Sequence, residues 1–257
     1  MTLSHHILTI ESGIATVAIN RPPVNAQSGP MREELIGIFD RLGEDPEVRV
    51  IVLTGTGKVF SAGADIKERT GIQTGYGDYA RNNRIVRNFF DVVTDCEKPV
   101  IAAVNGPMLG AGFVLALMCD FIIASETATF AMPEVDVGLA GGAAFMNQVF
   151  GRSRARAMYF TGRRYPASEL YRLGLAEAVV PAEQVLAEAM VYAREIAAKS
   201  PLAIAAAKQG FINVHELPLR DAYRYEQTLT VGLSKTEDAR EAQRAFVEKR
   251  PARFSGR

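Results

Sequence analysis

The sequence is poor in cysteine, with only Cys96 and Cys119 among its 257 residues. Two cysteines cannot build a disulfide framework, and their separation gives no metal-ligand spacing. Cys119 lies in an apolar stretch, where a small core residue is expected rather than a nucleophile. No other cluster of ligand residues supports a metal site. We therefore expect a protein without a metal, working in a reducing cytoplasm.

The sequence also lacks an excess of charge of either sign and a run long enough to span a membrane. Lys+Arg and Asp+Glu both number 29, so no bulk positive field would attract nucleic acid or a membrane surface. The longest apolar run, 108–119, is well short of the roughly 20 residues that a spanning helix needs. Residues 1–11 lack the basic start and apolar run of a signal peptide. We expect a soluble protein that would hold an anionic substrate through a few local cations.

Hydrophobic periodicity predicts an α/β chain whose last part is helical. Two β-rich runs, 7–11 and 14–20, are joined by Ser12-Gly13 as a hairpin turn. Further buried strands are expected at 48–54, 99–104 and 121–124. Helical spacing is expected at 31–42, 83–94, 113–119, 153–160, 167–173, 181–199, 202–213, 219–233 and 236–248. Residues 67–84 show no clear period and are expected to form a loop. The pattern divides the chain into an α/β part, 1–200, and a helical part, 201–257.

Three segments containing glycine follow predicted strands, and each must first be tested as a phosphate loop. Residues 55–58 (GTGK) lack the further glycine and the Lys-Ser/Thr ending of a P-loop. Residues 110–112 (GAG) are not followed by the third glycine of the dinucleotide-binding fingerprint. Nucleotide hydrolysis and hydride transfer are therefore poorly supported.

Two of the segments offer exposed main-chain N–H groups instead. Residues 60–66 (FSAGADI) place small side chains around one glycine, so the backbone can approach a ligand closely. Residues 105–112 (NGPMLGAG) do the same and enter a helix, where first-turn N–H groups lack intrahelical partners. Two N–H groups aimed at one point make an oxyanion hole, in which losing one donor costs a rate factor of roughly 100 to 1000. Taken alone, these segments could equally be tight turns that serve packing.

Several segments in order resemble the enoyl-CoA hydratase/isomerase family of the crotonase superfamily. They are 60–68 (FSAGADIKE), 99–112 (PVIAAVNGPMLGAG), Asp120, 130–138 (FAMPEVDVG) and 245–250 (AFVEKR), with weaker likeness at 21–26, 161–163 and 174–175. The resemblance covers nearly the whole chain. It implies the crotonase spiral of repeated ββα units forming stacked sheets. It also implies that 201–257 builds a trimer or a dimer of trimers.

The resemblance implies an acyl-CoA thioester as substrate, with CoA as part of the substrate and no separate cofactor. The two oxyanion donors carried over from the family are the N–H groups of Ala62 and Ala111, and the acid/base is Glu134. Phe246 and Lys249 match residues that pack and meet CoA phosphates from a neighbouring subunit. The implied substrate-binding positions are Ala64, Asp65, Ile66, Gly110, Val114, Phe246 and Lys249.

The sequence departs from the usual hydratases of the family at one catalytic position. Those enzymes use two glutamates that share the added water, and the first of the two falls on Val114, which cannot transfer a proton. Isomerases that convert 3-enoyl to 2-enoyl thioesters are similar to this arrangement, since one carboxylate at Glu134 can serve both carbons on one face. That role needs a pKa raised toward neutrality, which an apolar neighbour such as Val114 would favour. The dienoyl-CoA isomerases, whose further acids would fall on Val114 and Gly142, resemble it less.

Other functions of the same oxyanion hole stay open. Hydration with one glutamate, decarboxylation and hydrolysis would all use it, and a CoA-binding protein with little catalysis is the alternative from another class. The neutral charge and the lack of a basic stripe argue against RNA binding. The acyl pocket is expected to be shaped by 70–84, Phe113, Phe145 and the C-terminal helices.

Other titratable residues have simpler explanations. Asp136, if it lies on a strand or an extended turn, points to the side opposite Glu134. Asp65 is expected to cap the following helix, with Glu68 three residues on. A histidine base is not expected, because the three histidines lie outside every motif. They are His5, His6 and His215.

Overall fold

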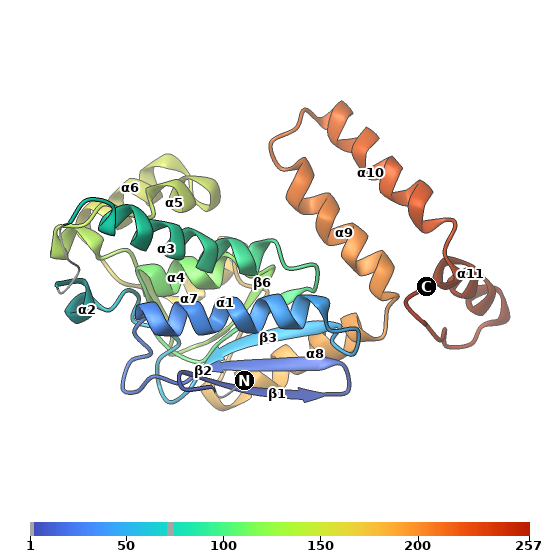
Figure 1. The fold of residues 1–257 in the computed structure, drawn as a ribbon, viewed down its shortest axis with the longest axis horizontal. Helices are drawn as coiled ribbons and strands as arrows, with labels where there is room; N and C mark the ends of the chain where they lie inside the picture. The colour runs from blue at the N-terminus through green and yellow to red at the C-terminus, as the bar shows by residue number, and fades with distance from the viewer. Residues whose placement is uncertain (1–2, 71–74) are drawn as a thin grey trace.

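The computed structural model describes residues 3–70 and 75–257, and a six-stranded sheet forms its centre (Figure 1). The strand order is β1-β2-β3-β4-β6-β9. The strands are β1 His6–Glu11, β2 Ile14–Ile19, β3 Val50–Gly55, β4 Val100–Val104, β6 Phe121–Ser125 and β9 Ala178–Val180. The first two form an antiparallel hairpin, and every later pair is parallel. The predicted hairpin and the three predicted buried strands are confirmed.

The sheet is covered on both faces, which explains why its central strands are continuously apolar. In β3, Val50 and Val52 pack in one cluster with α8 Val185–Ala197. The alternate residues Ile51 and Leu53 pack in the larger cluster with α1 Gly29–Glu44 and α3 Asp78–Thr94. Figure 1 shows α1 and α3 together on one side of the sheet. The core therefore consists of two apolar layers separated by the sheet.

A second, smaller sheet receives one short segment from successive turns of the chain. Its strands are β5 Met108–Leu109, β7 Thr129–Ala131 and β8 Tyr165–Pro166. Isolated bridges join Ser61 to Met108 and Gln27 to Ala64, so the segment after β3 extends this layer. The chain thus passes from β3 to 61–64, from β4 to β5 and from β6 to β7. This alternation is the repeated unit predicted from the resemblance.

Helices replace part of the loop expected at 67–84. The short helix α2 Ile66–Thr70 begins this stretch, and α3 begins at Asp78. The prediction of a loop is therefore wrong for 67–70 and 78–84, it holds for the turn at 75–77, and residues 71–74 lie outside the described residues. The start of α3 has no side-chain cap, because Gly77 precedes it with φ +89°. Its N-cap position consequently holds none of the residues Ser, Thr, Asp or Asn by which a sequence pattern marks a helix start.

The remaining helices were predicted in part. The shorter helices between the strands are α4 Ala111–Leu117, α5 Ala143–Val149, α6 Arg152–Thr161 and α7 Ala167–Arg172. Two 3-10 turns, η1 Glu134–Val137 and η2 Ala182–Gln184, also lie in this part of the chain. The helices α4, α6 and α7 were expected. The helix α5 and the three-residue strand β9 were not, because both are short and follow turn residues.

The C-terminal helices project away from the sheet (Figure 1). They are α9 Pro201–Val214, α10 Leu219–Leu233 and α11 Glu237–Glu248, as the periodicity predicted. Ser200 caps α9 by accepting from the N–H of Ala203. The side chain of Lys208 fixes α9 to the main body by donating to Asp120 at 3.0 Å and to the carbonyl of Lys98 at 2.9 Å. Within the described residues, no helix combines the length and apolar character that crossing a membrane requires.

Candidate active site

The two glycine-containing segments meet main chain against main chain. Gly63 has φ +86°, and a Cβ added there would lie 2.5 Å from the carbonyl oxygen of Leu109. A Cβ on Gly112 would collide with the carbonyl oxygen of Ser61. These glycines are therefore required by close approach, as the sequence suggested, and they hold segments 60–66 and 105–112 in fixed register.

The free donors of these segments are the N–H groups of Ala64 and Ala111. Ala111 is the first residue of α4, where a helix N–H has no intrahelical acceptor. Gly63 and Asp65, on either side of Ala64, both form hydrogen bonds with Gln27. The Gln27 N–H donates to the carbonyl oxygen of Gly63 at 2.8 Å, and the Asp65 N–H donates to the carbonyl oxygen of Gln27 at 3.2 Å. The Ala64 N–H therefore points away from that bridge. Neither donor has an acceptor within the described part of the chain.

The prediction for Ala62 is contradicted by its hydrogen bond. The Ala62 N–H donates to the carbonyl oxygen of Val24 at 2.9 Å, so it is already satisfied. The donor that faces the ligand side lies two residues later, at Ala64, a position expected only to contact CoA. Sequence pattern alone cannot separate the two alanines, because the difference lies in which one pairs with Val24.

A cavity of about 460 Å³ opens beside both free donors. Its walls come from α1, α3, α4 and the segment from Met132 to α5. Apolar lining residues are Val86, Phe90, Val114, Met132, Leu139 and Phe145, and polar ones are Arg32, Asn82, Asn83, Arg87 and Glu134. Ala64 and Ala111 complete the wall. The cavity thus brings together Ala64, Ala111, Val114 and Glu134, four positions that the sequence singled out.

The carboxyl group of Glu134 lies in this cavity with its pKa raised. Burial disfavours the ionised form and raises the pKa to about 7. The Oε2 atom of Glu134 is buried without a hydrogen-bond partner among the described residues. Gly110, with φ +52° and ψ −123°, makes room for the carboxylate, because a Cβ there would collide with Oε1 of Glu134. The predicted shift toward neutrality is confirmed.

Glu134 is the single carboxyl group in the described lining of this cavity. Val114 is 2% exposed and occupies the wall where the paired glutamate was expected. Gly142 has φ +98°, and a Cβ there would collide with Met132 and lie 3.7 Å from Val114. A further acid at that position would be strained. The described lining therefore offers one carboxyl group rather than a pair.

Tyr159 supports this part of the site, although no sequence motif pointed to it. Its hydroxyl donates to the carbonyl oxygen of Gly141 at 2.8 Å. Burial, with a smaller contribution from the charge of Glu134, raises the pKa of the phenol. Arg32, Asn82, Asn83 and Arg87 were also missed, because nothing in the helical pattern of α1 or α3 distinguishes them from surface residues.

Asp65 and Glu68 have structural roles. The Asp65 carboxylate accepts from the N–H groups of Lys67 and Glu68 at 3.0 and 3.2 Å, which confirms the predicted cap of α2. It also pairs with Arg21 at 2.6 Å. Glu68 accepts from the N–H of Gly29 at the start of α1 instead of completing a capping box. Asp65 and Ile66 lie next to the free Ala64 donor in the chain but outside the described lining of the cavity.

Two expectations about other positions need correction. Asp136 lies in the 3-10 turn η1 and not on a strand, and its carboxylate packs against Gly162, outside the cavity. Phe113 is fully buried against Phe130, with ring centroids 4.9 Å apart, so it does not line the pocket. Phe145 does line it, as expected.

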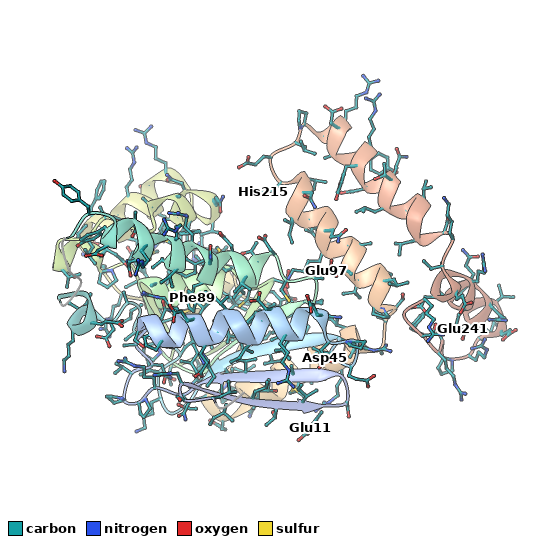
Figure 2. All side chains as sticks on the ribbon, in the orientation of Figure 1. Glu11, Asp45, Phe89, Glu97, His215 and Glu241 are labelled. Carbon is teal, nitrogen blue, oxygen red and sulfur yellow. The ribbon has the colours of Figure 1, made fainter. Side chains whose placement is uncertain are left out.

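The C-terminal positions lie apart from the cavity within one chain. Phe246 is 86% exposed on α11, and Lys249 ends that helix with φ +54°. The described part of helices α9 to α11 contributes nothing to the lining of the cavity. The histidines are also elsewhere: His6 bonds Glu34, and Figure 2 shows His215 at the far end of α9.

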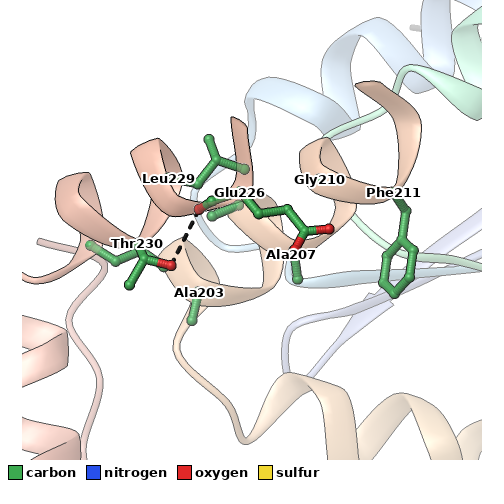
Figure 3. Close-up of a pocket in the computed structure, with 9 residues that line it drawn as sticks. Ala203, Ala207, Gly210, Phe211, Glu226, Leu229 and Thr230 are labelled. Carbon is green, nitrogen blue, oxygen red and sulfur yellow. Dashed lines mark hydrogen bonds between the residues drawn. The ribbon is translucent and has the colours of Figure 1, made fainter. Parts of the chain in front are cut away.

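A second hollow, of about 310 Å³, lies between α9 and α10 (Figure 3). Ala203, Ala207 and Gly210 form its wall on α9, facing Leu229 and Thr230 of α10. Both walls are helix interiors, whose main-chain N–H groups are bonded within the helix. This groove therefore has no pair of donors for a developing oxyanion, and the cavity at Glu134 is the better candidate.

Comparison with known proteins places the chain among relatives of one family. The family model described as enoyl-CoA hydratase/isomerase matches residues 9–257. A probable mitochondrial enoyl-CoA hydratase of Dictyostelium discoideum is 39% identical over 92% of this chain and 86% of its own. A probable enoyl-CoA hydratase of Rhizobium meliloti is 38% identical over 99% of this chain and 100% of its own. The crystal structure of enoyl-CoA hydratase from Bacillus anthracis superposes with a TM-score of 0.93, at 33% identity and over 99% and 100% of the two chains. The predicted fold class is confirmed.

Proposed function

We propose that this chain, which belongs to the enoyl-CoA hydratase/isomerase family, transfers a proton on an acyl-CoA thioester with a single glutamate. The observation behind the proposal is that one carboxyl group, Glu134, shares a cavity with the two free donors at Ala64 and Ala111. In this arrangement the thioester oxygen accepts from both N–H groups. Glu134 then removes a proton from the adjacent carbon.

The two main-chain donors act on the charge that develops in this step. Proton removal places negative charge on the thioester oxygen, and donors already fixed in position stabilise it without reorganisation. The Ala111 donor also lies at the positive end of α4, which adds to the attraction. A pKa of about 7 leaves Glu134 able both to take the proton and to return it near neutral pH.

Isomerisation of a 3-enoyl to a 2-enoyl thioester is the reaction that this geometry supports best. A single carboxyl group can take the proton at the α carbon and return it at the γ carbon. Hydration is the second candidate, favoured by the names of the relatives. It requires a water molecule positioned without a second carboxylate, since Val114 occupies that place. Decarboxylation and hydrolysis have no separate observation in their favour.

Assembly and location belong to the same proposal. We infer that the chain works in the cytoplasm as a trimer or a dimer of trimers, built through 201–257. Phe246 and Lys249 would then meet the CoA of a neighbouring subunit, and the exposure of Phe246 in the single chain is consistent with this role. The reaction as proposed uses no cofactor beyond the CoA of the substrate.

The test compares Glu134→Gln with Asp136→Asn, since Asp136 belongs to the same turn but its carboxylate lies outside the cavity. Purified protein is assayed with 2-enoyl-CoA and 3-enoyl-CoA side by side. Glu134→Gln should lower kcat/KM by roughly 100-fold or more, whereas Asp136→Asn should stay close to wild type. Unchanged turnover of every thioester by Glu134→Gln would refute the proposal. Hydration without isomerisation would select the second candidate.

A further inference from the structure

Gln27 has a fully buried amide side chain and contacts both of the segments that carry the free donors. Its main chain pairs with the first segment, since Gln27 forms an isolated parallel bridge with Ala64. Its side chain contacts the second segment, because Nε2 donates to the carbonyl oxygen of Ala111 at 3.1 Å. One residue outside both segments therefore contacts the two residues whose N–H groups are free.

The neighbours of the Gln27 amide determine its orientation. The Ser61 hydroxyl donates its hydrogen to the carbonyl oxygen of Asn25 at 2.8 Å, so toward Gln27 it can only accept. The carbonyl oxygen of Ala111 is an acceptor as well. Nε2 carries two hydrogens and lies 3.4 Å from Ser61 Oγ and 3.1 Å from Ala111 O, so it can donate to both. The opposite orientation of the amide would place Oε1 against two acceptors.

The bond from Gln27 restrains the direction of the second donor. Before Ala111 in the chain, the Gly110 N–H donates to the carbonyl oxygen of Ala131 at 2.9 Å. After it, the Gln27 side chain holds the carbonyl group of Ala111. The peptide group that carries the Ala111 N–H lies between these two bonds. Removal of the Gln27 amide would eliminate one of them and leave this N–H less well directed.

The amide oxygen of Gln27 argues against a role in stability alone. Oε1 is buried and has no hydrogen-bond partner among the described residues. An unpartnered buried acceptor destabilises a fold, and an apolar side chain of similar length, such as methionine, would not have this effect. The amide is therefore an unfavourable choice for packing at this position. Its benefit is the bond that orients the Ala111 segment.

We propose that Gln27 is a positioning residue for the reaction and keeps the N–H groups of Ala64 and Ala111 aimed at one point. This inference rests on the proposed function, in which the thioester oxygen accepts from both groups. Gln27 lies outside the described lining of the cavity, so it acts through the donors and not on the substrate. Poorly directed donors lose most in the transition state, where the oxygen carries more negative charge than in the bound substrate.

The first measurement compares the kinetics of Gln27→Met with those of the wild type. Methionine keeps the length of the side chain and removes its donors. The variant should lose kcat by roughly 10- to 100-fold, whereas KM should change by less than about threefold. Gln27→Glu keeps the shape of the side chain but places an acceptor against the carbonyl oxygen of Ala111. It should lose at least as much kcat, and it gives the same test should Gln27→Met not fold.

Thr54→Val is the matched control. It deletes another buried bond from a side chain to the main chain, in which the Thr54 hydroxyl donates to the carbonyl oxygen of Ala103 at 2.7 Å. Thr54 belongs to the main sheet and lies outside the described lining of the cavity. The control should unfold at a lower urea concentration than the wild type and keep both kinetic constants.

The second measurement observes the donors without turnover. The probe is butanoyl-CoA, isotopically labelled at its thioester carbon, which has no double bond to isomerise or hydrate. A carbonyl group that accepts hydrogen bonds is polarised, and its infrared stretching frequency falls. Binding to the wild type should lower this frequency relative to the free thioester. Gln27→Met should lose part of the shift, and Thr54→Val should keep all of it.

The two measurements separate this inference from the proposed function. A wild-type frequency shift in Gln27→Met would overturn the inference, because the donors would then be intact, and so would a wild-type kcat. Both results leave the proposed function in place. A wild-type protein that does not shift the frequency at all would remove the oxyanion hole and this inference with it. Turnover that Glu134→Gln leaves unchanged would remove only the proposed base, and the frequency comparison would still decide the role of Gln27.

Discussion

At the scale of single residues, the chemistry of the site depends on the surroundings of one carboxyl group. Burial raises the pKa of Glu134 from an ordinary 4.5 to about 7, with no second carboxylate in the described lining to share the proton. The folded protein therefore holds a proton that the unfolded chain would release between these pH values. The resulting loss of stability appears as the pH rises through this interval. The burial that brings the pKa of Glu134 near neutrality therefore lowers the stability of the folded protein at neutral pH.

The pH dependence of activity follows from the same shift. Glu134 must be ionised to remove a proton, so kcat/KM for a 3-enoyl-CoA should fall about tenfold for each pH unit below 7 and level off above it. Steady-state rates measured from pH 5 to 9 with a substrate of constant ionisation would check this. A midpoint near 4.5 would mean that burial does not control the group.

Gly110 is the residue whose replacement should damage the site most specifically. Alanine there must adopt φ +52° and would collide with the carboxylate of Glu134. Gly110→Ala should lower kcat/KM at least tenfold and destabilise the fold by about 1–3 kcal/mol. Gly174→Ala is the control, because Gly174 also has positive φ but has open space where a Cβ would lie. Gly174→Ala should lower the free energy of unfolding. Its kcat/KM, calculated for the fraction of protein that is folded, should match the wild type.

The residue scale also shows where sequence pattern stops being informative. Glu134 and Val114 were identified correctly as cavity neighbours because their positions within motifs are fixed relative to glycines. The choice between Ala62 and Ala64 was wrong, because it depends on a hydrogen bond to Val24 from a segment about forty residues away. Side-chain identity says nothing about that bond, since both residues are alanine.

At the scale of elements, the sequence pattern predicts long helices and strands well and short ones poorly. The long amphipathic helices α1, α9 and α10 have clear periods and were found within a few residues. The strand β9 has three residues, too few to show a period, and it forms only through pairing with β6. The turn η1 follows Pro133, and its hydrogen bonds replace the extended conformation that was expected. Tertiary pairing decides such short elements.

The connection between α9 and the main body makes a prediction at this scale. Lys208, 6% exposed, joins Asp120 and the carbonyl of Lys98, and Asp120 also accepts from the N–H of Val100 at 2.6 Å. Lys208→Met should destabilise the protein by about 1–3 kcal/mol, since it leaves two acceptors without their shared donor. Urea unfolding measures this, with the exposed Lys235→Met as control. Equal stability of the two variants would show that the contact is dispensable.

At the scale of the whole molecule, the C-terminal helices leave apolar side chains without partners in a single chain. Phe211, Leu219 and Phe246 are each more than four-fifths exposed, at 81%, 86% and 86%. Exposed aromatic groups on helices that project from the body are typical of surfaces covered by another subunit. The proposed trimer or dimer of trimers is implied by the family resemblance alone, because composition and periodicity carry no information on subunit arrangement.

The proposed assembly can be tested through Phe246. The protein should sediment as three or six chains, and Phe246→Ala should raise KM for CoA thioesters several-fold, because a neighbouring subunit would lose part of its CoA contact. Val247→Ala removes a comparably exposed apolar side chain from the adjacent position and serves as control. A wild-type protein that sediments as a monomer and is fully active would contradict the assembly.

The close contact between Gly63 and Leu109 has a consequence for how such an enzyme can diverge. The N–H donors at Ala64 and Ala111 are tied to each other through the backbone, so mutations of most surrounding side chains leave them in place. A substitution of one wall residue, such as Val114, therefore leaves the two donors in position while it changes the groups that face the substrate.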